Sequence, residues 1–147
     1  MKKKSLIEVI SFLLMFLFLY TGISKLITFE TFQFDMTRSP IVRNYPTFSA
    51  IALPTIEILI SICLFVPKYR KWGLYSSLIL MFTFTIYIFY MLKFTPDRPC
   101  TCGGVIRQMS WPNHLYFNAF FCILSLTGVL LYNRSSVTRL ETKYSHI

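Results

Sequence analysis

The segment "LIEVISFLLMFLFLYTGISKLI", residues 6–27, decides the fold class. It is apolar apart from Glu8, Ser11 and a mildly polar end, and it is long enough to cross a hydrocarbon core about 30 Å thick. The basic start of the chain also fits a signal peptide. However, the apolar run continues past Tyr20 and no clear A-x-A cleavage site follows it. We therefore expect an uncleaved first membrane span.

Three further segments have the same character, at about residues 48–66, 72–92 and 115–132. Each has a length of about 18–22 residues, which suits a transmembrane helix. A helix of a soluble bundle would carry a polar stripe, and these segments lack one. The sequence predicts an all-α integral membrane protein, a four-helix bundle forming one domain over residues 1–132. A polar cytoplasmic tail is expected over residues 133–147.

The composition agrees with a lipid environment and argues against nucleic acid as a partner. Hydrophobic residues make up 54% of the chain and charged residues 14%, against about 25% charged in soluble proteins. The net charge is +9, but no basic cluster is interleaved with a polar domain. In a membrane protein, Lys and Arg outside the spans usually set the orientation.

The positive charges favour cytoplasmic N- and C-termini. With that orientation the cytoplasmic side holds nine basic residues, namely Lys2, Lys3, Lys4, Lys68, Arg70, Lys71, Arg134, Arg139 and Lys143. The outer side holds six, namely Lys25, Arg38, Arg43, Lys93, Arg98 and Arg107. The segment at residues 93–114 then faces outwards, where disulfides can form and persist.

This outer segment contains "TPDRPCTCGGV", residues 95–105, with a Cys-X-Cys pair at Cys100 and Cys102. In extended chain the two Cα atoms would lie about 6.6–7 Å apart, whereas a disulfide usually spans about 4.4–6.8 Å. A bond between them requires a bent backbone, and strained, exposed disulfides are the exchangeable ones. Pro99 before the pair and Gly103-Gly104 after it supply the bend.

Dithiol–disulfide exchange is the interpretation that we favour for this pair, and three others stay open. A structural disulfide between the two cysteines would close too small a loop to add much to the stability of the fold. A metal site with Cys100, Cys102 and His114 would have three ligands where structural zinc has four, so we assign no metal. Two inert thiols are uncommon in an oxidising compartment.

A second group of polar residues lies inside the spans. Glu57 falls near the membrane midplane, one turn after Pro54, and Lys25 near the outer end of the first span is its candidate partner. Ionisable groups inside membranes are functional candidates. The site is either a proton or quinone-headgroup site, with a quinone as the candidate cofactor, or a polar contact that fixes helix packing.

The fourth span carries a polar stripe of His114, Asn118, Cys122 and Ser125, spaced to share one helical face. Such stripes often hold helices together. The more specific hypothesis makes His114 a proton acceptor for the loop thiols.

Cys63 and Cys122 lie at different depths, so we expect no disulfide between them.

The layout resembles a known family. Its features are "YTGISKL" at residues 20–26, Pro54 and Glu57 in the second span, and "CTCGG" before "MSWPNHLYFN" at residues 109–118. Together they resemble the MauE/DoxX group of membrane proteins, especially the methylamine-utilisation MauE branch. The resemblance implies redox and disulfide chemistry at a bacterial inner membrane, with Cys100 and Cys102 as the redox pair. One departure is Gly103-Gly104, where many MauE proteins have Phe-Gly.

Two hypotheses of function follow. In the first, the protein is a possible thiol-disulfide oxidoreductase that exchanges electrons with a periplasmic thiol protein or client through Cys100 and Cys102, aiding maturation of an exported protein. His114 would assist proton transfer, and electrons could pass to a quinone near Glu57, Asn118 and Lys25. In the alternative, the protein is a non-enzymatic membrane chaperone or assembly subunit that captures its client by mixed disulfide or metal.

Overall fold

The computed structural model describes residues 2–94 and 110–144, and within this part of the chain all regular structure is helical. Four long helices form the bundle: α1 at Lys2–Ile27, α3 at Pro46–Phe65, α4 at Arg70–Phe94 and α5 at Trp111–Tyr144. A short helix, α2 at Phe29–Arg38, joins α1 to α3. The predicted all-α bundle is confirmed.

Each of the four long helices contains a stretch long and apolar enough to cross a membrane, at Lys3–Ile27, Pro46–Phe65, Arg70–Phe94 and Pro112–Ser135. Their outward faces carry large apolar side chains; Phe16, Ile79 and Ile123, for example, are 62%, 67% and 65% exposed. A surface this apolar suits lipid and would be unfavourable in water. The protein is therefore a multi-span membrane protein in contact with the bilayer.

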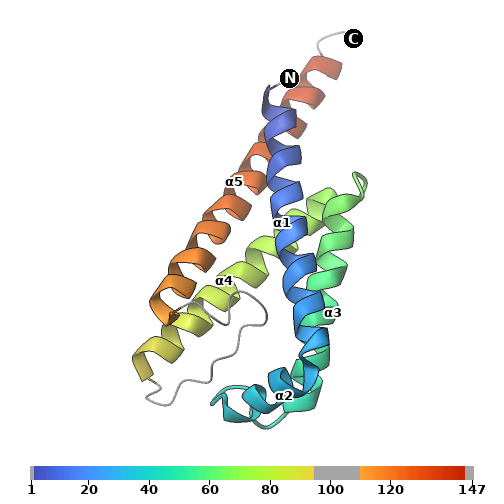
Figure 1. Cartoon of the computed structure of the whole chain (residues 1–147). Helices are drawn as coiled ribbons and strands as arrows, with labels where there is room; N and C mark the ends of the chain where they lie inside the picture. Colours follow the sequence, from blue (N-terminus) through green and yellow to red (C-terminus); the bar gives the residue numbers. More distant parts are fainter. Residues whose placement is uncertain (1, 95–109, 145–147) are drawn as a thin grey trace.

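The chain alternates in direction through the bundle, so the start of α1 and the end of α5 lie at the same end (Figure 1). We call this the terminal end. The end of α4 and the start of α5 lie at the opposite end, where α2 also lies; we call this the α2 end. The expectation that both chain ends share a side fits this arrangement. Assignment of that side to the cytoplasm stays a prediction.

Small residues set how closely the helices approach. A Cβ at Gly73 would lie 2.9 Å from the backbone nitrogen of Leu64, so α4 crosses α3 with no room for a side chain. A Cβ at Gly128 would lie 3.0 Å from side-chain atoms of both Ile10 and Leu74. Small residues at such crossings are typical of membrane helices, because lipid provides no hydrophobic drive and close packing must supply the contact.

The main core fills the space between the four long helices. It consists of the buried residues Ile7, Ile10, Leu14, Phe18, Ile60, Leu64, Leu74, Met81 and Val129. A smaller cluster of Phe32, Met36 and Ala50 anchors α2 on α3.

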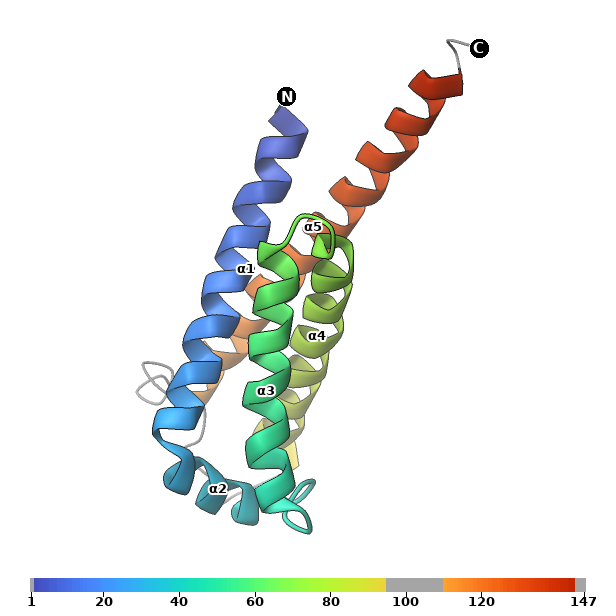
Figure 2. The same ribbon diagram turned by 90° about the vertical axis from the view of Figure 1, so that its right-hand side faces the viewer.

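Helix α2 lies across the α2 end of the bundle, at a steep angle to the long helices (Figure 2). The sequence led us to expect that residues 28–47 lie along the interface or fold over the bundle, without predicting a helix there. Phe32, Asp35 and Met36 face inwards while Glu30 and Arg38 are exposed, so the helix is amphipathic.

Helix α5 runs further than its apolar part. It continues through the polar segment after residue 132 as far as Tyr144, and its end projects beyond the neighbouring helices (Figure 2).

Candidate functional site

A cavity of about 400 Å³ lies inside the bundle, towards the α2 end. All five helices contribute to its walls. The polar or charged lining residues are Thr21, Lys25, Glu57, Thr83, Tyr87, Tyr90, His114 and Asn118. The others are apolar, among them Phe18, Phe32, Met36, Leu53, Phe84 and Phe117. A mostly apolar pocket with a few convergent polar groups is the usual form of a small-molecule site.

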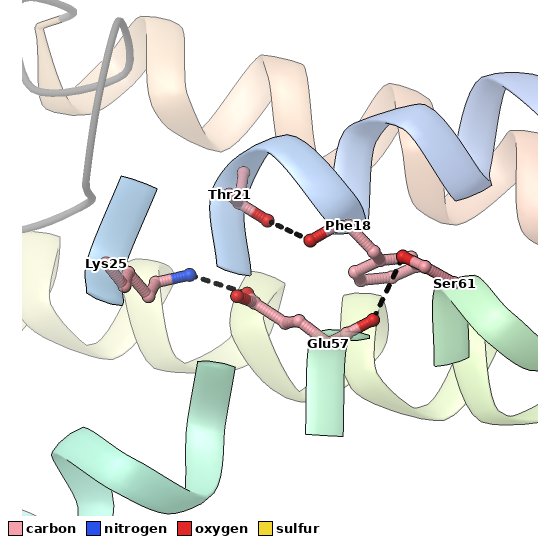
Figure 3. A network of polar contacts seen from close by, with 5 residues as sticks. All are labelled: Phe18, Thr21, Lys25, Glu57 and Ser61. Atoms are coloured by element: carbon pink, nitrogen blue, oxygen red, sulfur yellow. Dashed lines mark hydrogen bonds and ion pairs between the residues drawn. The ribbon is translucent and has the colours of Figure 1, made fainter. Parts of the chain in front are cut away.

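An ion pair between Lys25 and Glu57 forms the polar centre of this cavity. Lys25 Nζ donates a hydrogen bond to Glu57 Oε1 over 2.5 Å, and the two side chains are 9% and 1% exposed (Figure 3). The partnership suggested by the sequence is therefore present. Because a lone charge inside a membrane is costly, each group makes the burial of the other tolerable.

The local sequence brings the two helices close at this point. A Cβ at Gly22 would lie only 3.2 Å from the carbonyl oxygen of Pro54, so glycine lets α1 approach α3 one turn from both charges. Ser61, one turn after Glu57, donates to the carbonyl oxygen of Met15 over 3.1 Å. This second contact fixes the depth of α3 relative to α1.

The second carboxylate oxygen of Glu57 takes no part in the ion pair with Lys25. Among the described residues, Glu57 Oε2 is buried and has no hydrogen-bond partner. The hydroxyl of Thr21 lies beside the carboxyl, but its single hydrogen is donated to the carbonyl oxygen of Phe18 over 3.3 Å (Figure 3). A buried carboxylate oxygen without a partner is unfavourable and invites a donor from elsewhere.

Two aromatic rings flank the Lys25 ammonium group. Its nitrogen lies 5.8 Å from the ring centroid of Phe32 on α2 and 5.7 Å from that of Phe84 on α4. Cation–π attraction of this kind is strongest where water is excluded. The sequence did not single out either ring, because both come from segments far from Lys25 and Glu57 in the chain.

The polar stripe predicted on the fourth span faces the bundle interior. His114, Asn118 and Ser125 are 7%, 4% and 0% exposed, and Cys122 is half-buried. Asn118 Nδ2 donates to the carbonyl oxygen of His114 over 3.1 Å. The structure thus brings together His114, Asn118, Lys25 and Glu57 around one cavity, and the role of His114 as a proton acceptor stays a prediction.

The Cys-X-Cys pair, Cys100 and Cys102, lies outside the described residues. Its flanking helices are described: α4 ends at Phe94 and α5 begins at Trp111. Both of these helix ends lie at the α2 end of the bundle (Figure 1). These two helix ends therefore lie at the end of the molecule towards which the cavity also lies.

The other two cysteines are half-buried and form no disulfide in the part of the chain that the structure describes. This agrees with the expectation that Cys63 and Cys122 do not pair. Over the same residues, no group of three or more His, Cys, Asp or Glu side chains is arranged to hold a metal ion.

A second polar contact was not foreseen from the sequence. Tyr87 on α4 donates from its hydroxyl to Ser39 Oγ over 2.9 Å, and Ser39 directly follows α2. This bond holds the end of α2 against the cavity wall to which Tyr87 belongs. Because Ser39 and Tyr87 are far apart in the sequence, no local pattern predicts their hydrogen bond.

The fold and the cavity together define a multi-span helical membrane protein with an ion pair buried at an internal, largely apolar site. The chain belongs to the MauE family: the family model described as methylamine utilisation protein MauE matches residues 3–131. The resemblance to MauE is thereby confirmed, and its DoxX part stays untested. No curated protein and no solved structure matches the chain.

Proposed function

We propose that this MauE-family protein exchanges electrons with a thiol protein on the outer face of a bacterial inner membrane, through Cys100 and Cys102. The observation that supports the proposal is the position of the two helix ends on either side of the Cys-X-Cys segment. The end of α4 and the start of α5 lie at the end of the bundle towards which the cavity of Lys25, Glu57 and His114 lies. The excess of basic residues at the terminal end supports an outward-facing loop.

The exchange is balanced in two steps. In the reducing direction, the thiolate of one loop cysteine attacks a client disulfide, forming a mixed disulfide and releasing one client thiolate. The second loop cysteine then attacks the mixed disulfide, releases the second client thiolate and leaves Cys100 and Cys102 joined. Two electrons pass to the client. The reverse sequence oxidises the client, and the relative reduction potentials set the direction.

Arg98 and Arg107, close to the pair in sequence, support this chemistry because positive charge favours the nucleophilic thiolate. His114, in the first turns of α5, is the proposed proton acceptor. An exported protein whose disulfides need rearrangement would be the client. We transfer no substrate from the family's methylamine-utilisation description.

The test is thiol trapping in intact cells, in a Cys63→Ala/Cys122→Ala background so that only the loop pair reports. A membrane-impermeant maleimide is applied with and without prior reduction. We expect both cysteines to be labelled only after reduction, which shows an outward-facing, reversible disulfide. Labelling without reduction would show a dithiol at rest, and the reducing direction would be favoured.

The Cys100→Ser and Cys102→Ser variants identify the partner. One of them should accumulate a mixed disulfide with the client, since the resolving thiol is missing. A client that co-purifies at a fixed ratio and is not turned over would support the alternative of a non-enzymatic assembly subunit. If only a membrane-permeant maleimide labels the pair, the loop faces the cytoplasm and the proposal fails.

A further inference from the structure

We propose that the cavity between the helices binds a lipid-soluble hydroquinone, and that Glu57 makes the site prefer the reduced hydroquinone over the oxidised quinone. This inference goes beyond the proposed thiol exchange and does not depend on it. It starts from Glu57 Oε2, which has no hydrogen-bond partner among the residues that the structure describes. This oxygen belongs to a side chain only 1% exposed, on a residue that lines the cavity.

The unpartnered oxygen defines the first requirement, a hydrogen-bond donor on the ligand. As a carboxylate paired with Lys25, Glu57 can only accept hydrogen bonds. A ring hydroxyl meets this requirement. A quinone carries only carbonyl acceptors and leaves the oxygen unpaired. A site built to hydrogen-bond a hydroxyl discriminates strongly against an analogue that lacks it, because the buried polar group is then left without a partner.

The cavity walls define the second requirement, a flat aromatic ring. Phe32 and Phe84 flank the ammonium group of Lys25, and Tyr87 and Phe117 complete an aromatic lining. Aromatic side chains favour stacked or edge-to-face contact with another ring. An acyl chain would fill apolar space equally well, but it would use neither the rings' geometry nor the carboxylate oxygen.

Size and access agree with a ring that bears a tail. The volume of about 400 Å³ falls within the roughly 300–1,000 Å³ of typical small-molecule sites. Among the lining residues, Ile41, Ile86 and Tyr90 are 57%, 53% and 40% exposed. The cavity therefore reaches the apolar surface of the bundle, where a lipid tail can extend into the membrane.

The experiment compares a decyl-chain benzoquinone with its hydroquinone, kept reduced under anaerobic conditions, on the full-length protein in nanodiscs. Binding is measured by titration calorimetry. We expect saturable binding with a dissociation constant at least about tenfold lower for the hydroquinone. Glu57→Gln should bring the ratio of the two constants close to one. Absence of saturable binding, an equal affinity for both forms, or an unchanged ratio in Glu57→Gln would each overturn the proposal.

Three further variants keep the result interpretable. Lys25→Met/Glu57→Leu removes both charges together and so avoids an unpaired buried charge; it should abolish the preference. Ser61→Ala lies one turn away on α3, outside the cavity. It should retain the preference because the Ser61 hydroxyl contacts only backbone carbonyl oxygens, those of Met15 and Glu57, and leaves the Glu57 carboxylate untouched. Cys100→Ser/Cys102→Ser should also retain it, which separates this inference from the proposed thiol exchange. Loss of the preference in Ser61→Ala would mean that helix packing, and not the carboxylate, selects the ligand.

Discussion

Lys25 and Glu57 face each other across the α1–α3 contact, with Nζ and Oε1 2.5 Å apart and both side chains at least nine-tenths buried. Each helix supplies one charge, and each charge makes the other tolerable in a medium of low dielectric. The pair joins the two helices at the cavity, beside the close approach that Gly22 permits. The same two side chains therefore join the helices and form the polar centre of the cavity for which we propose a ligand.

Removing one partner of this pair should destabilise the protein far more than removing both. Glu57→Leu and Lys25→Met each leave an unpaired buried charge, and we expect each to lower the free energy of unfolding by about 3–5 kcal/mol. The double variant should lie within about 1 kcal/mol of the native protein. Unfolding by SDS in mixed micelles, followed by circular dichroism, measures all four proteins. Additive effects of the two single changes would show that the charges do not interact.

The two glycines at helix crossings should respond differently to alanine. At Gly73 a methyl group would meet the backbone of α3 at 2.9 Å and 3.0 Å, so the helices must separate, at about 1–3 kcal/mol. At Gly128 it would meet side-chain methyl groups of Ile10 and Leu74 at 3.0 Å, and no backbone atom. A shift of a few tenths of an ångström in these side chains relieves the contact, and alanine gains up to about 1 kcal/mol of helix propensity.

We therefore expect Gly73→Ala to lower the midpoint of thermal unfolding in detergent and Gly128→Ala to leave it nearly unchanged. The two variants serve as controls for each other, since both add one methyl group to a buried helix position. Equal midpoints would indicate that α3 and α4 adjust to the added methyl group without loss of packing.

Orientation in the membrane can be tested at two exposed positions. Ser5 lies at the terminal end on α1 and Thr31 lies on α2. In a chain with its four natural cysteines replaced, an impermeant maleimide on intact cells should label Thr31→Cys and leave Ser5→Cys unlabelled. Permeabilised cells should label both, which controls for access. The opposite pattern would invert the topology and remove the oxidising environment that Cys100 and Cys102 require.

His114 should contribute to the rate of thiol exchange if it accepts a proton from the loop. We expect His114→Asn to slow the reaction of the reduced pair with a small aromatic disulfide by about 10²-fold at neutral pH. Ser125→Ala, buried on the same face of α5 but outside the cavity, should react at the native rate. Stopped-flow absorbance follows the released thiolate. Equal rates for the native protein and His114→Asn would leave the residue with a packing role.

Much of the site's membrane framework could be predicted from the chain alone. Glu57 and Lys25 stand out because charges are rare in apolar segments, and Lys25 was the candidate partner because it lies near the outer end of the first span. The buried stripe from His114 to Ser125 followed from helical periodicity. These features depend only on the order and spacing of residues along the chain, so they can be recognised in the sequence.

The cavity could not be predicted in the same way. Phe32 and Phe84 are two of fifteen phenylalanines in the chain, and nothing local distinguishes them from those that face lipid, such as Phe16. The helical form of α2 was also missed, because its amphipathic pattern is short and lies among turn-forming residues. The bond between Ser39 and Tyr87 joins the residue after α2 to α4, two segments that are far apart in the chain.

The sequence by itself determined that this protein is a bundle of four membrane-spanning helices. It did so because the hydrocarbon core demands long apolar segments whose backbone groups are satisfied within each helix. Only the tertiary structure decided which side chains converge. Close approach at Gly22, packing of α2 across the bundle and the aromatic rings around Lys25 arise from contacts between distant segments. Within the described part of the chain, those contacts leave one oxygen of Glu57 without a hydrogen-bond partner at the cavity, and no pattern along the chain encodes that arrangement.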